Sequence, residues 1–345
     1  MKRVFVESLK EGAKVEEVFL VTSKSVGNAR NGAYIRLRLG DRTGQIDAMK
    51  WNASEAEIAR FDEGDYVLVR GTVGTYNDNL QLTADSVKRF GDPVDPADFI
   101  RSSPRDPEQM MTEFEGLISQ VTQPHLSRLL SDVFNDPQTR GKFMQAPAAK
   151  SVHHAYIGGL LEHTLNVVRS CSVLADLYPI VDRDLLLAGA ALHDIGKLDE
   201  FTWSGAINYS DSGHLVGHIV GGAMLAARTA ESIPGFDPLL SLALQHMILS
   251  HHGTKEWGSP KQPKSLEAVM LHAADDLDAK TAILAQAIEE SSDSGAFTKR
   301  HYLLDRPIFK GLPRQADAAG EPASGEAPDL ELFAVEGKYD PFADD

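Results

Sequence analysis

The chain contains histidine and aspartate residues of the kinds that bind divalent metal ions. His193 and Asp194 close the apolar run LLLAGAALHD, and Gly196 follows them. Further candidates lie in separate apolar segments: His163, His218, the group His246, His251 and His252, and Asp275. Imidazole nitrogens and carboxylate oxygens together suit Mn²⁺, Fe²⁺, Co²⁺, Ni²⁺ or Zn²⁺. Because the set exceeds what one ion needs, the sequence predicts two ions bridged by Asp194, with open positions for a phosphate.

The segments that carry these residues have the apolar spacing of amphipathic helices. We expect helices over residues 110–121, 126–134, 156–176, 182–195, 217–231, 238–250 and 265–290. No strand is expected among them, so residues 110–310 are predicted to form an all-α bundle. Adjacent side chains on a helix point about 100° apart, so at most one of Asp276 and Asp278 can share the site with Asp275. Glu162 and Glu200 are candidates to hold ligand imidazoles in place.

Residues 1–90 show the alternation and turn residues of a small all-β domain. Apolar runs over residues 15–23, 33–40, 45–51, 66–71, 73–76 and 80–84 accompany a polar helical piece over 52–61. We interpret them as five strands with a helix between the third and the fourth, which is the order of an OB-fold barrel. The segments DRTGQIDAMKW and GDYVLVRGTVGTYNDNLQL resemble those of nucleic-acid-binding OB domains.

An OB barrel binds single strands by stacking bases on exposed aromatic rings beside basic side chains. The candidates for this role are Tyr34, Arg36, Arg38, Trp51 and Tyr76. Alternation does not tell which of them face outward, so the aromatic rings could instead fill the barrel core.

Composition marks further boundaries. Four prolines between residues 93 and 107 predict a linker over residues 91–109. The net charge is −16, yet residues 1–90 hold 14 Lys and Arg against 13 Asp and Glu. This distribution excludes a protein that coats nucleic acid through its overall charge. The acidic helical surface would confine a strand to one path or serve as an interface in a homo-oligomer. Residues 311–345, with 2 basic and 9 acidic residues, are expected to be a disordered tail.

The sequence also predicts a cytoplasmic protein. No apolar run approaches the roughly 20 residues needed to cross a membrane, and the N-terminal stretch MKRVFVESLKEG lacks the features of a signal peptide. The single cysteine, Cys171, cannot form an internal disulfide and argues against a structural thiolate zinc site.

The order of the metal-binding candidates resembles that of the HD-domain metal-dependent phosphohydrolases. The resemblance implies that His163, His193, Asp194 and Asp275 are the four defining ligands, and that His218 and His251 complete a second site. It implies two divalent ions, with Mn²⁺ favoured. Lys197, in HDIGK, corresponds to a residue that contacts substrate phosphate. His252 is expected to face the phosphate too, so Asp194, Lys197 and His252 are the residues expected to act in catalysis.

Both parts together, over residues 5–310, resemble the YhaM-type bacterial 3′→5′ exoribonucleases. This resemblance implies hydrolysis of single-stranded RNA to nucleoside 5′-monophosphates, with single-stranded DNA as a further candidate substrate. Two alternatives stay open. The helical domain could hydrolyse nucleotides or cyclic dinucleotides while the barrel regulates it, or the chain could be a non-catalytic nucleic-acid-binding factor. The residues alone do not choose the metal, the sugar of the substrate or the oligomeric state.

Overall fold

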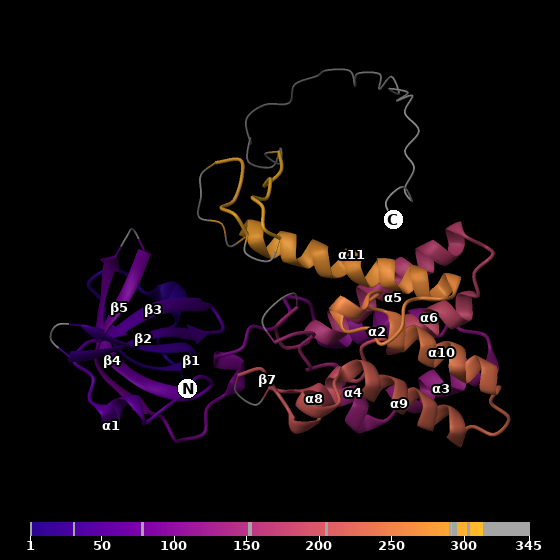
Figure 1. Ribbon diagram of the computed structural model, residues 1–345, viewed down its shortest axis with the longest axis horizontal. Coiled ribbons are helices and arrows are strands. Elements are labelled where there is room, and N and C mark those ends of the chain that lie inside the picture. The colour runs from indigo at the N-terminus through magenta and orange to yellow at the C-terminus, as the bar shows by residue number, and fades with distance from the viewer. Residues whose placement is uncertain are drawn as a thin grey trace, which may run out of the picture. The chain divides into compact units, whose positions relative to one another are not determined.

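The computed structural model describes residues 2–29, 32–76, 79–150, 154–203, 206–289, 291, 295–301 and 304–312 (Figure 1). The chain divides into two compact units, Met1–Glu290 and Ser291–Asp345. The predicted tail lies outside the described residues except for Gly311 and Leu312. The predicted domain limits at 90, 109 and 310 stay predictions. No helix in the described part of the chain is long and apolar enough to cross a membrane.

The N-terminal part is a closed five-stranded barrel, which confirms the predicted OB-fold class. Its strands are β1 (Lys14–Ala29), β2 (Gly32–Asp41), β3 (Gly44–Lys50), β4 (Tyr66–Tyr76) and β5 (Asn79–Arg89). Their order around the barrel is β1-β2-β3-β5-β4, and only the β3–β5 pair is parallel. The short helix α1 (Glu55–Ile58) follows β3, as expected, and Ser54 and Glu57 form a capping box at its start.

Strand β4 is continuous where two separate apolar runs were predicted. The pairing of β4 with β5 shifts between Arg70 and Gly71, which marks a β-bulge. A Cβ atom at Gly71 would lie 2.2 Å from the carbonyl oxygen of Thr83, so the close approach of the two backbones requires glycine there. The extra residue lies in β5, where the pairing skips Asp85, so Ala84 and Val87 both reach the core although they lie three residues apart.

The helical part contains ten α-helices among the described residues. They are α2 (Pro107–Ile118), α3 (Pro124–Phe134), α4 (Pro137–Phe143), α5 (Gly159–Leu177), α6 (Arg183–Leu192), α7 (Lys197–Glu200), α8 (Asp211–Leu215), α9 (His218–Ser232), α10 (Pro238–Ser250) and α11 (Leu266–Glu289). Several begin with an aspartate cap followed by proline, as at Asp106, Asp136 and Asp237. The expectation of no strand needs one correction, because β6 (Phe201–Thr202) pairs with β7 (Asn208–Tyr209). Strands of two residues are too short to show a period in the sequence.

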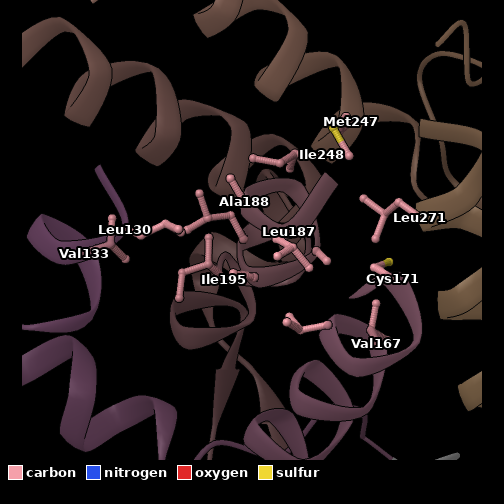
Figure 2. Close-up of a cluster of buried hydrophobic side chains, with 14 of the residues drawn as sticks. Leu130, Val133, Val167, Cys171, Leu187, Ala188, Ile195, Met247, Ile248 and Leu271 are labelled. Atoms are coloured by element: carbon pink, nitrogen blue, oxygen red, sulfur yellow. The ribbon is translucent and has the colours of Figure 1, made fainter. Parts of the chain in front are cut away.

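Helix α6 lies at the centre of the helical core. Every residue from Leu185 to Leu192 is buried. Figure 2 shows Leu187 and Ala188 among side chains of α5, α10 and α11, including Val167 and Ile248. A Cβ atom at Gly189 would lie 2.3 Å from the Cε atom of Met247, so glycine lets α6 and α10 approach closely. Such packing on all sides fixes the position of the C-terminal end of α6.

Candidate metal centre and nucleic-acid surface

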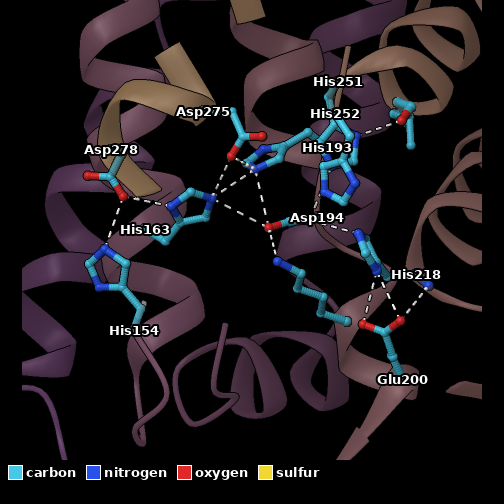
Figure 3. Close-up of polar contacts among 12 residues, drawn as sticks. His154, His163, His193, Asp194, Glu200, His218, His251, His252, Asp275 and Asp278 are labelled. Atoms are coloured by element: carbon cyan, nitrogen blue, oxygen red, sulfur yellow. Dashed lines mark hydrogen bonds and ion pairs between the residues drawn. The ribbon is translucent and has the colours of Figure 1, made fainter. Parts of the chain in front are cut away.

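Five helices bring the predicted metal ligands together, and Figure 3 shows how their side chains converge. His193 and Asp194 directly follow α6, and His251 directly follows α10. His218 is the first residue of α9. The remaining two ligands, His163 and Asp275, lie within α5 and α11. Side chains separated by up to 112 residues in the sequence thus converge on one buried point, because α5, α10 and α11 pack on α6 and α9 packs on α10.

The first group of ligand atoms surrounds His163. Its Nε2 atom lies 3.2 Å from Nε2 of His193, 3.1 Å from Oδ1 of Asp275 and 3.5 Å from Oδ2 of Asp194. Nδ1 of His163 donates to Asp278 at 2.7 Å, and Nδ1 of His193 donates to the Ala190 carbonyl at 2.8 Å. A neutral imidazole that donates through Nδ1 keeps a lone pair on Nε2. Two such lone pairs beside carboxylate oxygens fit a divalent cation.

The second group of ligand atoms lies around the other carboxylate oxygen of Asp194, Oδ1. Nε2 of His218 and Nε2 of His251 each lie 3.5 Å from Oδ1 of Asp194. These three buried atoms have no hydrogen-bond partner within the described residues. Orphaned polar atoms are rare in protein interiors, and three that face one another are explained if a cation binds between them. His252 belongs to the same group of potential ligands.

The Nδ1 atoms of this second group are fixed by neighbouring acceptors. His218 donates to Glu200 at 3.0 Å, His251 to the Ile248 carbonyl at 2.7 Å, and His252 to the Trp257 carbonyl at 2.7 Å. Each imidazole is therefore oriented with Nε2 towards Asp194 or towards the space beside it. The sequence left open which of His246, His251 and His252 is a metal ligand. His246 does not point at the site, because its Nε2 atom accepts a hydrogen bond from the backbone N–H of Lys264 at 2.9 Å.

The pKa values of the buried groups depend on a balance between burial and neighbouring charges. Burial would raise the pKa of Asp194, but Lys197 and His193 outweigh it and hold that pKa well below its usual range. Burial lowers the pKa of His163, yet hydrogen bonds with Asp194 and Asp275 outweigh it and raise the pKa well above its ordinary value. A position that attracts a proton this strongly would attract a divalent cation for the same electrostatic reason.

His252 has the opposite tendency. Burial, and then the neighbouring His251, lower the pKa of His252 to about 4. Its ring is therefore neutral at neutral pH, with Nδ1 occupied by the Trp257 carbonyl and Nε2 available as an acceptor or a ligand.

The sequence allowed at most one of Asp276 and Asp278 to share the site with Asp275, and Asp278 is the one that does. It accepts from Nδ1 of His163 at 2.7 Å, from Nε2 of His154 at 3.0 Å and from the Asn166 amide at 3.0 Å. The signal for it is its spacing, because residues three apart on a helix share a face and Asp275 was already a candidate. Asp276, the other neighbour, pairs with Lys280 at 2.7 Å.

Of the two glutamates considered as imidazole partners, only Glu200 has that position. It lies 2.9 Å from Nδ1 of His218. Glu162 instead accepts from the Tyr156 hydroxyl at 2.9 Å and from the Ser103 hydroxyl at 2.7 Å. The described contacts of Glu162 include no ligand imidazole, because Asp278 accepts the hydrogen bond from Nδ1 of His163.

A cavity of about 350 Å³ opens beside the ligand groups. Its lining includes Lys197, His218, His252 and Asp275. Lys197 is buried, and its Nζ atom lies 2.6 Å from Oδ2 of Asp194. The lysine thus holds the carboxylate between the two ligand groups and also borders the cavity.

The predicted nucleic-acid-binding residues all lie on the outside of the barrel. Trp51 and Tyr76 are 48% and 64% exposed. Tyr34 is half-buried against Trp51, with their ring centroids 5.4 Å apart. Arg36 and Arg38 point outward from β2 beside Asp47, at 3.8 and 3.3 Å. The alternative that these aromatic rings fill the barrel core is excluded, because buried aliphatic side chains and Phe19 and Phe61 occupy it.

Known families match both parts of the chain. The HD domain family matches residues 160–280, and the OB-fold nucleic acid binding domain family matches residues 20–89. The chain is 35% identical over 312 residues to the 3′-5′ exoribonuclease YhaM of Geobacillus sp., covering 88% of this chain and 95% of that protein. It is 34% identical to the protein of the same name from Bacillus subtilis and 37% identical to that from Shouchella clausii, covering 86% of this chain and 95% and 93% of those proteins.

The barrel and the ligand groups together define a metal-dependent hydrolase of the HD-domain class that also carries an OB-fold nucleic-acid-binding domain. The class is the one that the order of histidines and aspartates predicts. Because the similarity extends over nearly the full length of the relatives, the chain belongs to the YhaM family of 3′-5′ exoribonucleases.

Proposed function

We propose that the protein is a 3′→5′ exonuclease that hydrolyses single-stranded RNA to nucleoside 5′-monophosphates. One observation carries the proposal. Three buried ligand atoms around Asp194 have no partner within the described residues, beside a cavity suited to a phosphate group. The chain also has an OB-fold barrel with aromatic and basic side chains on its outer face. The names of the relatives support the same activity.

The metal centre of this proposal binds two divalent ions, and we favour Mn²⁺. His163, His193 and Asp275 would hold one ion and His218 and His251 the other, and Asp194, which faces both groups, would be shared between them. When bound, the ions would lower the pKa of a water molecule and neutralise phosphate charge. Lys197 orients the shared carboxylate of Asp194 and offers a positive charge at the cavity wall. His252 stays neutral there and can accept a hydrogen bond.

The barrel would bind the single strand. Tyr34, Trp51 and Tyr76 would stack on bases, and Arg36 and Arg38 would pair with phosphates, because the outer β2–β3 face and the neighbouring loops are where OB folds bind strands. RNA is the proposed substrate, with single-stranded DNA as a second one. A cytoplasmic location fits the single buried thiol of Cys171. Self-association stays a prediction, which sedimentation would test.

Strands labelled separately at the 5′ and 3′ ends test the activity. The purified protein is incubated with single-stranded RNA or DNA and a panel of Mn²⁺, Co²⁺, Fe²⁺, Ni²⁺, Zn²⁺ and Mg²⁺. We expect immediate release of the 3′ label as a mononucleotide, and stepwise shortening of the 5′-labelled strand. Asp194→Asn should be inactive, whereas Asp199→Asn should retain activity because Asp199 is exposed and pairs only with Lys142 among the described contacts of its side chain.

Two outcomes would contradict the proposal. Hydrolysis of mononucleotides or cyclic dinucleotides, with no shortening of long strands, would make the chain a nucleotide phosphohydrolase with a regulatory barrel. A protein that binds strands, hydrolyses nothing and contains no metal after reconstitution would be a non-catalytic binding factor.

A further inference from the structure

The outer wall of the cavity contains an aromatic side chain that has no place in the metal centre. Trp257 lies in a short 3₁₀ helix, Lys255–Trp257, and is 56% exposed although it borders the cavity. The cavity volume of about 350 Å³ is near the lower end of the range of roughly 300–1,000 Å³ for small-molecule pockets. It therefore suits a single nucleotide.

Two side chains lie near the indole of Trp257. Nζ of Lys280 lies 5.7 Å from the ring centroid, and the ring of His272 lies 6.4 Å away. A lysine ammonium group at this distance is attracted to the face of an aromatic ring. The remaining surface of the indole borders the cavity and is open.

The same short loop connects Trp257 to the metal centre. The carbonyl oxygen of Trp257 accepts the Nδ1 proton of His252 at 2.7 Å. Gly258 follows with φ +93°, a left-handed conformation that favours glycine and lets the chain turn back after the tryptophan. The distance between the indole and the histidine is therefore set by a few residues of local backbone, so a group on the indole lies at a defined position relative to the centre.

We propose that Trp257 stacks on the base of the 3′-terminal nucleotide and so holds that nucleotide in the cavity beside the metal centre. This inference rests on the proposed exonuclease function. Stacking suits an enzyme that shortens a strand of any sequence, since every base has a π face. Trp257 is thus a residue that binds the nucleotide to be removed, whereas the barrel aromatics bind the strand that stays.

A strand whose 3′-terminal residue lacks its base tests this directly. Two 5′-labelled RNA strands are compared, one ending in adenosine and one ending in an abasic ribose, and removal of that last residue is timed. We expect the protein to prefer the adenosine by about 5- to 150-fold in kcat/KM, the range for one base–aromatic stack. The difference should lie mainly in KM, because stacking stabilises bound substrate and transition state alike.

Substitutions then locate the effect. Trp257→Ala should lower kcat/KM for the adenosine strand to that of the abasic strand, and Trp257→Phe should restore most of the preference. The His252 hydrogen bond uses the backbone carbonyl of residue 257, so it remains available in both variants. Trp51→Ala is the matched control, since it should weaken strand binding without changing the ratio between the two strands.

The outcomes separate the two proposals. A protein that shortens neither strand with any metal contradicts the exonuclease function and this inference with it. A protein that removes adenosine and abasic ribose equally fast overturns the stacking role alone. So does a Trp257→Ala variant that slows both strands by the same factor, because a purely structural role would produce that result.

Discussion

The metal centre and the strand-binding face of the barrel are built in opposite ways. His163, His193 and His251 are fully buried, and each Nδ1 is fixed by a carboxylate or a backbone carbonyl. On the barrel, Trp51 and Arg36 point into solvent, and the Arg36 ion pair with Asp47 is long, at 3.8 Å. Chemistry at phosphorus needs ligand atoms in fixed positions, whereas binding strands of any sequence is compatible with open, adaptable contacts.

The same local hydrogen bond orients two of the histidines in the metal centre. His193 and His251 each directly follow a helix, α6 and α10, and each returns Nδ1 to a carbonyl three residues earlier. The last carbonyls of a helix have no partner within it. Each histidine therefore satisfies such a carbonyl and is at the same time oriented for metal binding.

The largest expected contrast between the two regions comes from the shared carboxylate. Asp194→Ala should lower hydrolysis by on the order of 10³-fold or more, because both ligand groups lose their common member. Strand affinity should stay within about twofold, measured by fluorescence anisotropy with a labelled RNA. The variant leaves Lys197 buried without its partner, so Asp194→Asn, which keeps the shape, serves as the control for folding. A comparable loss of strand affinity in both variants would show that the centre also holds the strand.

A smaller effect is expected one contact further out. Asp278→Asn should weaken metal binding or activity by about 10- to 100-fold, because the partner that orients His163 loses its charge. Titration of metal-free protein with Mn²⁺ measures the affinity, and Asp276→Asn is the matched control, since Asp276 pairs with Lys280 on the same helix. Equal Mn²⁺ affinities in the two variants would show that Asp278 does not orient His163 for metal binding.

On the barrel, substitution should affect binding and leave the chemistry unchanged. Trp51→Ala should weaken single-strand binding by about 1–3 kcal/mol if the ring stacks on a base. The rate at saturating substrate should not change, because the substituted ring contributes equally before and during the reaction. Steady-state kinetics on a long strand measure both quantities. If kcat fell with the affinity, the separation between binding and chemistry would be lost.

The barrel also contains a buried carboxylate, with a structural role. Burial would raise the pKa of Glu17, but hydrogen bonds from the backbone of Val18, Arg3 and Val4 outweigh it and lower the pKa below the usual 4.5. A lowered pKa in the folded state gives stability that is present above pH 4.5 and lost as the pH falls through the lowered value.

Glu17→Gln should therefore reduce the free energy of unfolding by about 1–2 kcal/mol at neutral pH, and by less in acid. Urea unfolding of the full chain at pH 7 and pH 3 gives the comparison, followed by tryptophan fluorescence in a background with Trp203 and Trp257 replaced by phenylalanine, so that Trp51 of the barrel reports. An equal loss at both pH values would mean that the charge of Glu17 contributes nothing. Hydrolysis at neutral pH should be unchanged, which would keep this carboxylate distinct from those of the centre.

Much of the fold and the types of ligand could be predicted from the sequence. Alternation along β2 and β3 and helical spacing around His163 and His193 reflect local periods of two and 3.6 residues, which adjacent residues alone establish. The same local logic separated the barrel from the helices and placed His193 and Asp194 at a helix end. The bulge at Gly71 and the two-residue strands β6 and β7 were missed, since neither extends over enough residues to form a pattern.

The tertiary structure decided which atoms meet. Asp278 holds the imidazole of His163, 115 residues away in the sequence, because α11 packs beside α5. Trp51 and Tyr76 point outward because aliphatic side chains fill the barrel. The sequence by itself determined the chemical inventory and the local periods. Only packing determined the contacts between distant segments, since each depends on how several helices or strands enclose a common core.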